Sequence, residues 1–222
     1  MIQLYTAPTP NGYKISIALE ELGLPYEMHV VDIRVGEQFK PEFLAISPNN
    51  RIPALVDPEG PGGPISLFES GAILLYLAER YGGLLPTDPA GRYTAIQWLM
   101  WQMGGLGPML GQAHHFRQYA PTPVPYAIDR YTNEAHRLYR VMDTRLAEVD
   151  YLAGSYSIAD IACWPWIRPY KLQGQDLTEF PNLHRWFTTI AARPAVQRGK
   201  RMPESFDQPM DENAKRVLFG QR

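Results

Sequence analysis

The chain has 222 residues, 45% of them apolar, and its 21 basic and 23 acidic residues leave a formal net charge of −2. This length allows one large domain or two of ordinary size, with enough apolar residues for a substantial core. The charges of both signs are scattered, which argues against the clustered basic face of a nucleic-acid-binding protein, and no segment is uniformly apolar enough to span a membrane.

The first eighty residues alternate short strands with helices. Apolar spacing and Gly or Pro punctuation predict strands at 2–5, 26–31, 54–57 and 65–68, and helices at 12–22, 41–46 and 70–81. The order is strand, helix, strand, short helix, then two strands and a helix. It predicts a small sheet that contains one parallel and one antiparallel pair.

From residue 84 onward the apolar period is that of helices throughout. Residues 84–91 are the predicted linker, the glycines and proline of 104–108 interrupt one helix, and a long helix runs from about 128 to 149. Ser157 and Asp160 match a helix capping box. We therefore predict a first domain at 1–83, an all-helical domain at 91–203 and a C-terminal tail at 204–222.

Cys163 is the only cysteine, which excludes an internal disulfide bond and a zinc site built from several cysteines. Its place between Ala162 and Trp164 in a predicted buried helix indicates an inert core residue. The N-terminal residues lack the pattern of a secretory signal, and a lone cysteine fits a reducing compartment. We expect a cytoplasmic protein without a bound metal and without nucleic-acid or membrane partners.

The first candidate for chemistry is the turn that contains Thr9 and Asn11, between the first strand and the first helix. A thioredoxin-like fold places its redox Cys-x-x-Cys there, because a helix N-terminus stabilises a thiolate. This chain has no cysteine in the segment, so a hydroxyl, a side-chain amide and backbone N–H groups remain to hold a thiolate that arrives with a ligand. Taken alone, the motif favours a plain turn.

Two further segments carry candidate binding groups. A cis bond between Ile52 and Pro53 would leave the Ile52 backbone available to pair with a peptide-like ligand. Ser70, at the start of a helix, can bind an anion, and Glu69 beside it can accept an ammonium group. Together they match the carboxylate and amine of an amino acid, although Ser70 also suits ordinary capping.

Several motifs together resemble the glutathione transferase superfamily. They are APTPNG at 7–12, SPNNRIP at 47–53, LFESGAILLYLA at 67–78 and SIADIACWPW at 157–166. GGLGPMLG at 104–111 and PYAIDR at 125–130 are similar to the bacterial nu class, the glutathione-dependent disulfide-bond oxidoreductases. The resemblance covers roughly residues 1–200 and implies a thioredoxin-like α/β domain followed by an all-α domain.

The resemblance also implies a homodimer that binds glutathione, and roles for particular residues. Glu69 and Ser70 would hold the γ-glutamyl end, and the Ile52 backbone beside Pro53 would pair with the cysteinyl portion. The remaining expected contacts are Gln38 at the glycyl end or a second glutathione, Thr9 and Asn11 nearest the sulfur, and Arg130 from the partner subunit. One site is expected to accept two glutathiones or glutathione disulfide.

Three functions remain open from the sequence. The first is reduction of small disulfides by the thiolate of bound glutathione, with weak or no transferase activity. The second is conjugation of glutathione to electrophiles, and the third is a non-catalytic regulatory role. Tyr5 is interpreted as a packing residue of the first strand, and the sequence does not decide whether His114 or His115 lines a second-substrate pocket.

Overall fold

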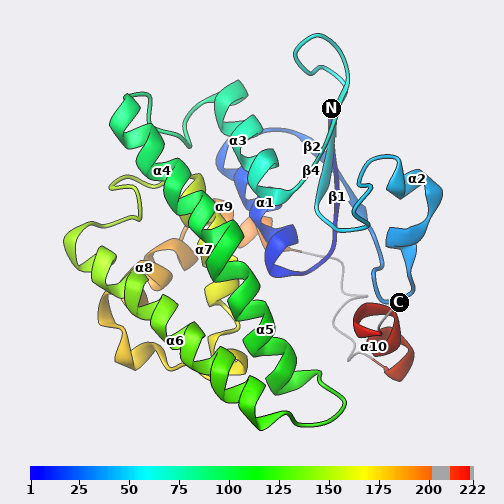
Figure 1. Cartoon of the computed structure of the whole chain (residues 1–222). Coiled ribbons are helices and arrows are strands. Elements are labelled where there is room, and N and C mark those ends of the chain that lie inside the picture. Colours follow the sequence, from blue (N-terminus) through cyan, green and yellow to red (C-terminus); the bar gives the residue numbers. More distant parts are fainter. Residues whose placement is uncertain (202–210, 221–222) are drawn as a thin grey trace. The chain divides into compact units, whose positions relative to one another are not determined.

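The structure is a computed structural model of the chain, and it describes residues 1–201 and 211–220. The chain divides into two compact units (Figure 1). The first contains residues 1–80 and the described residues from 195 onward, and the second contains residues 81–194. Residues 204–210 and 221–222 of the predicted tail lie outside the described residues.

The first unit is an α/β domain built on one four-stranded sheet. In chain order its elements are β1 (Ile2–Thr6), α1 (Pro10–Glu21), β2 (Tyr26–Val30), a short helix (Glu37–Phe39), α2 (Pro41–Leu44), β3 (Ala54–Asp57), β4 (Ile65–Phe68), α3 (Ser70–Tyr81), α9 (Pro194–Gly199) and α10 (Glu212–Phe219). The strand order is β2-β1-β3-β4. β1 pairs parallel with β2 and antiparallel with β3, and β3 pairs antiparallel with β4, which confirms the mixed sheet.

The two faces of this sheet carry different layers. Figure 1 shows α1 and α3 on one side of the strands and α2 on the other. The apolar face of α1, with Ile15, Ala18 and Leu19, is completely buried. A smaller core forms around Phe43 of α2, where Val31 and other apolar side chains meet it. Burial on both faces makes this sheet a rigid base for the loops at its ends.

The first helix begins two residues earlier than the sequence pattern predicts. α1 starts at Pro10 and not at Gly12. Proline lacks an N–H and has its φ fixed near the helical value, so it is well accommodated in the first turn of a helix. Pro10 therefore belongs to the helix and not to the turn before it.

The C-terminal part of the chain returns to α1. Ser16 Oγ donates to the Gly199 carbonyl at 2.6 Å, and Arg198 Nε lies 2.6 Å from Glu20 Oε2. Glu20 also accepts from the Tyr26 hydroxyl, and burial together with that carboxylate raises the pKa of Tyr26 to about 12. These contacts attach α9 to the first unit.

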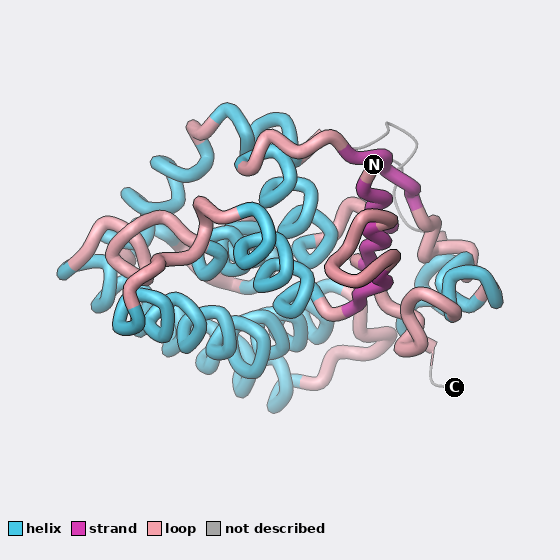
Figure 2. The backbone as a smooth tube through the Cα atoms, turned by 90° about the horizontal axis from the view of Figure 1, so that it is seen from above, coloured by secondary structure: helices cyan, strands magenta, loops and turns pink. Residues whose placement is uncertain are grey.

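The second unit is helical. Its elements are α4 (Pro89–Trp101), a π-helical segment (Gln102–Leu106), α5 (Gly107–Gln118), α6 (Pro125–Glu148), α7 (Ile158–Ile167), two short helices (Tyr170–Gln173 and Leu177–Glu179) and α8 (Pro181–Ala191). Figure 2 shows the strands confined to the first unit, and a single isolated bridge, Ala153 with Ser155, is the β-pairing in the second. None of the helices in the described part of the chain is long and apolar enough to cross a membrane.

The predicted interruption at 104–108 takes the form of a widened turn. The π-helical segment carries the chain from α4 into α5 without a break. Pro108 falls in the first turn of α5, where its missing N–H is least disruptive. Asp88 caps α4 by accepting from Gly91 N at 2.7 Å, so this helix begins inside the predicted linker.

The capping box at α7 is confirmed. Ser157 Oγ accepts from Ala159 N at 3.3 Å, and Asp160 Oδ2 accepts from Ser157 N at 3.0 Å. The other oxygen of Asp160 accepts from Leu152 N at 3.0 Å and from Trp186 Nε1 at 2.8 Å. Complete burial raises the pKa of Asp160 to about 6, although these hydrogen bonds oppose the shift.

Candidate functional site

The sheet register brings three of the predicted segments to one edge. Ala54, the first residue of β3, pairs with Tyr5 near the end of β1 and with Phe68 at the end of β4. Adjacent strands lie about 4.8 Å apart, so the loops that leave β1 and β4 and the loop that enters β3 are neighbours. The candidate residues of these loops therefore share one edge of the first unit.

Thr9 is the N-cap of α1. Its backbone is extended, and its Oγ1 accepts from Gly12 N at 3.1 Å. A hydroxyl accepts through its lone pairs and keeps its hydrogen for donation, so capping leaves Thr9 able to donate to a ligand. A side chain at position 12 would collide with the Ala7 carbonyl, and glycine thus allows the close turn from β1 into α1. The positive end of the helix dipole adds to the attraction for an anion here.

The second segment presents backbone groups. The Ile52–Pro53 peptide bond is cis, as expected. Among residues 1–201 and 211–220, neither the N–H nor the C=O of Ile52 has a hydrogen-bond partner. Unpaired backbone groups beside a sheet edge are suited to a peptide ligand, which can extend the pairing as a strand would.

The third segment contains a residue in an unusual conformation. Glu69 has a φ of +70°, in the left-handed region that residues other than glycine seldom adopt. It connects the end of β4 to Ser70, the first residue of α3, whose side chain is 6% exposed. Such conformations persist where the surrounding structure imposes them, and they concentrate at ligand sites.

Lys14 is a member of this region that the sequence analysis missed. Its side chain is 1% exposed, and its Nζ donates to Ser70 Oγ at 3.3 Å. Lys14 follows Asn11 by three residues on α1, so both lie on the same side of that helix. The contact thereby connects the segment around Thr9 with the start of α3. The signal in the sequence was a lysine next to the apolar run that begins at Ile15 in the first helix.

Gln38 and Arg130 lie in different units. Gln38 is buried; its Nε2 donates to the Ile33 carbonyl at 3.1 Å, and its Oε1 has no partner among the described residues. It is therefore equipped to accept from a ligand N–H. Arg130 lies in α6 of the second unit, with its side chain exposed and NH1 4.0 Å from Glu134 Oε2.

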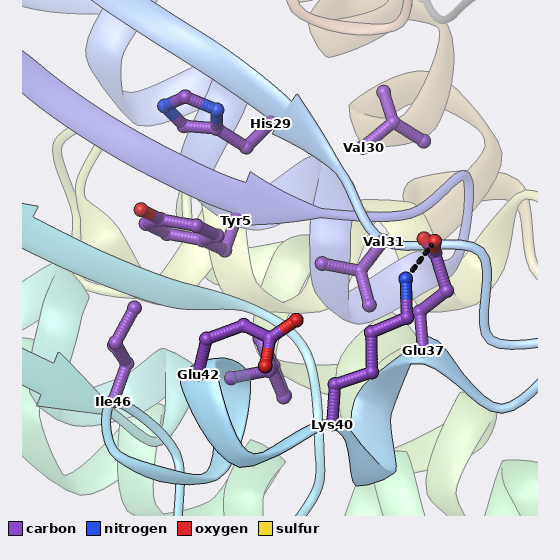
Figure 3. A pocket seen from close by; sticks show the side chains of 9 residues that line it. Tyr5, His29, Val30, Val31, Glu37, Lys40, Glu42 and Ile46 are labelled. Atoms are coloured by element: carbon purple, nitrogen blue, oxygen red, sulfur yellow. Dashed lines mark hydrogen bonds and ion pairs between the residues drawn. The ribbon is translucent and has the colours of Figure 1, made fainter.

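Tyr5 packs on the sheet face that α2 covers. Its ring stacks on His29 with centroids 4.7 Å apart (Figure 3), and its hydroxyl donates to Gln3 Oε1 of the same strand at 3.2 Å. These contacts support the packing interpretation of Tyr5. A shallow hollow on this face is lined by Tyr5, His29, Val30, Val31, Glu37, Lys40, Glu42, Phe43 and Ile46.

The remaining candidates lie in the second unit. His114 and His115 both belong to α5; His114 stacks on Tyr119, and burial lowers its pKa. Cys163 is completely buried in α7. No group of three or more His, Cys, Asp or Glu side chains in the described ranges is placed to hold a metal ion.

Comparison with known proteins identifies related chains. The family description "Glutathione S-transferase, N-terminal domain" matches residues 4–85, and "Glutathione S-transferase, C-terminal domain" matches residues 125–189. Disulfide-bond oxidoreductase YfcG of Escherichia coli strain K12 is 55% identical over 199 residues, which span 88% of this chain and 93% of that protein.

Two solved structures are similar over almost the whole chain. A glutathione transferase family member from Pseudomonas fluorescens pf-5, with two glutathiones bound, has a TM-score of 0.86 and 50% identity over 91% of this chain and 93% of its own. A glutathione transferase from Pseudomonas putida, with one glutathione disulfide bound per subunit, has a TM-score of 0.87 and 49% identity over 91% of each chain. This chain belongs to the glutathione S-transferase family of enzymes.

Proposed function

We propose that this enzyme is a glutathione-dependent disulfide-bond reductase whose reacting thiol belongs to bound glutathione. The observation that carries this proposal is the N-terminus of α1, where Thr9 offers a hydroxyl at the place of a thioredoxin-like redox cysteine. The one cysteine of the chain, Cys163, is buried in the other unit. A sulfur brought by the ligand replaces the missing protein thiol.

Glutathione would extend along the shared sheet edge. Its γ-glutamyl end would bind at Glu69 and Ser70, and its cysteinyl amide would pair with the Ile52 backbone beside Pro53. Gln38 would accept from the glycyl N–H through its unpartnered Oε1. We further propose a homodimer of the nu class in the cytoplasm, in which Arg130 reaches the ligand bound by the partner subunit.

The reaction would proceed by two thiol–disulfide exchanges. The thiolate of the first glutathione attacks one sulfur of the substrate disulfide, which forms a mixed disulfide and releases one substrate thiolate. The thiolate of a second glutathione attacks the glutathione sulfur of that mixed disulfide and releases the second substrate thiolate. One substrate disulfide is reduced to two thiols, and two glutathiones are oxidised to glutathione disulfide. The two similar structures that hold two glutathiones or one glutathione disulfide support this stoichiometry.

Thr9 and Asn11 would make the thiol a better nucleophile. A free thiol with a pKa of about 8.5 is only a few per cent ionised at neutral pH. A hydroxyl donor at Thr9, the Asn11 amide and the dipole of α1 all favour the thiolate. Each one lowers the thiol pKa by stabilising the charged form.

The test is glutathione-dependent reduction of hydroxyethyl disulfide, with oxidised glutathione recycled by glutathione reductase. Thr9→Val combined with Asn11→Ala should lower kcat/KM by about 100-fold, a loss of roughly 3 kcal/mol of transition-state stabilisation. Thr9→Ser alone retains the hydroxyl and should stay within a few-fold of the wild type, as should Cys163→Ala. Undiminished activity of the double variant, or inactivity of Cys163→Ala in a folded protein, would contradict the proposed mechanism.

Conjugation of glutathione to electrophiles is the second candidate, because both similar structures carry the name glutathione transferase. It predicts faster turnover of aryl halides than of disulfides by the same preparation. A regulatory protein without catalysis predicts that neither substrate is turned over although glutathione binds. Parallel assays of the two substrates therefore distinguish all three functions.

A further inference from the structure

The last helix of the chain, α10, has one apolar face. The helix follows its N-cap Asp211, whose side chain accepts from Ala214 N at 2.7 Å. Ala214 is 5% exposed, and Val217 and Leu218, three and four residues further along, are half-buried. Side chains at this spacing lie on the same face of a helix. A helix of eight residues is not stable on its own in water, so α10 depends on what this face contacts.

The apolar face of α10 meets the segment 32–39, which connects β2 to α2 (Figure 1). A Cβ atom at Gly36 would lie 3.9 Å from Cγ1 of Val217, an ordinary van der Waals distance. Gly36 has a φ of +89°, in the left-handed region that favours glycine. The backbone of the segment is therefore shaped at the point where Val217 packs on it.

Asp32 holds the segment together. Its carboxylate accepts from Arg34 Nε and NH2 at 2.9 Å each, and its N–H donates to Glu37 Oε2 at 2.7 Å. The hydrogen bond to Asp32 raises the pKa of Arg34, and the charge of Asp211 at the start of α10 also raises it. Because these bonds link residues 32–37, a shift of Gly36 would move the whole segment.

Gln38 belongs to the same segment and carries a group that requires a partner. Its side chain is 3% exposed, and its Nε2 donates to the Ile33 carbonyl at 3.1 Å. Its Oε1 is buried and has no hydrogen-bond partner within residues 1–201 and 211–220. A buried acceptor without a partner is unfavourable, so a donor supplied by a ligand would stabilise this arrangement.

We propose that α10 is a positioning element that sets the preference of the site for a glycyl residue, because Val217 holds the segment that carries Gln38. This inference rests on the proposed function, in which Gln38 accepts from the glycyl N–H of glutathione. γ-Glutamylcysteine has the same first two residues, but it ends in a carboxylate where glutathione has this N–H. The carboxylate has no hydrogen to donate to Gln38 Oε1, so Gln38 favours the tripeptide.

The first experiment measures this preference in the full chain. Calorimetry would give the Kd of glutathione and of γ-glutamylcysteine for the wild type and two variants. Val217→Asn removes the apolar contact with Gly36 and should lower the preference for glutathione about 5-fold, with little change in affinity for γ-glutamylcysteine. Asn213→Ala, on the exposed side of the same helix, should keep the full preference. An unchanged preference in Val217→Asn would overturn the inference.

A second pair of variants tests whether α10 acts through Gln38. Gln38→Ala removes the acceptor, so Val217→Asn should not lower the preference further in that background. A further 5-fold loss there would show that α10 acts by another route. In the enzyme assay, Val217→Asn should raise the KM for glutathione by the same factor as the Kd. It should leave kcat at saturating glutathione little changed, because Gln38 acts on binding and not on the sulfur.

The wild type provides a test that does not depend on the folding of any variant. If α10 strengthens binding of the glycyl residue, a bound glycyl residue must stabilise the contact of α10 with the segment 32–39 by the same factor. Saturating glutathione should therefore slow amide hydrogen exchange in α10 by about 5-fold, and saturating γ-glutamylcysteine should not. Equal exchange with the two ligands would overturn the inference and leave the proposed function intact. A wild type that binds neither ligand would contradict both.

Discussion

Replacement of Asp160 in α7 should show how strongly one buried carboxylate holds the second unit together. Its two oxygens accept from Leu152 N, Ser157 N and Trp186 Nε1, besides the Ser157 hydroxyl, and its side chain is completely buried. Asp160→Ala would leave three buried N–H donors without their acceptor. Each such donor costs about 1–3 kcal/mol, so we expect a loss of about 5 kcal/mol in the free energy of unfolding.

Asp160→Asn removes the charge of the side chain and keeps its size and shape. The amide keeps one oxygen acceptor, but its NH2 group opposes a donor such as Ser157 N. The expected loss is about 2–3 kcal/mol, smaller than for alanine. Urea titration followed by tryptophan fluorescence measures both values, and Asp129→Asn, at an exposed position of α6, is the matched control with no expected change.

The raised pKa of Asp160 determines in which direction the stability changes with pH. Burial raises the pKa of Asp160 from 3.8 to about 6, so the folded protein binds the proton more tightly than the unfolded chain does. The resulting stabilisation is fully present below pH 3.8 and is lost as the pH rises through about 6. A difference of about two pKa units corresponds to about 3 kcal/mol.

The advantage of the wild type over Asp160→Asn should therefore grow as the pH falls from about 7 to about 4. The measurement is the difference between the two urea midpoints across that range, with Asp129→Asn treated in parallel. A difference that stays constant, or an Asp160→Ala variant that loses less than about 1 kcal/mol, would refute this account of the buried carboxylate.

Three further substitutions test other residues of the first unit, at positions 9, 199 and 69. Thr9→Asp should keep the cap of α1 and the melting temperature but place a negative charge beside the glutathione sulfur. That charge disfavours the thiolate, so a pH titration of thiolate absorbance should show a raised pKa of the glutathione thiol. We expect kcat/KM to fall at least about 10-fold. Gly199→Ala would place a Cβ 2.7 Å from the Ile17 backbone. Urea titration should show a free energy of unfolding that is lower by about 2 kcal/mol or more. Gly104→Ala is the control and should change that free energy little, because no atom lies within 4 Å of its added Cβ. Glycine adopts the left-handed conformation of residue 69 without strain, so Glu69→Gly should be more stable than Glu69→Gln by about 1 kcal/mol. Both variants lose the carboxylate, and calorimetry should show that both bind glutathione more weakly than the wild type.

Much of the fold could be predicted from local patterns. β3 and β4 match the predicted ranges to the residue because a turn rich in glycine and proline separates two short apolar runs. The sequence pattern predicts the start of α1 at Gly12 because a proline at position 10 is typical of a turn, although proline also starts helices. The π-helical segment was not predictable, since glycines interrupt a helical pattern in the same way whether the helix breaks or widens.

The strand order explains the position of some residues of the candidate site, whereas others are placed by contacts between residues far apart in the chain. A mixed sheet in the order β2-β1-β3-β4 brings the ends of β1 and β4 to the same edge, one on each side of β3, so Thr9 and Ser70 follow strands that end at one edge of the sheet. Lys14 has no such local signal, because an isolated lysine on a helix is normally solvated and its burial depends on an element 56 residues away.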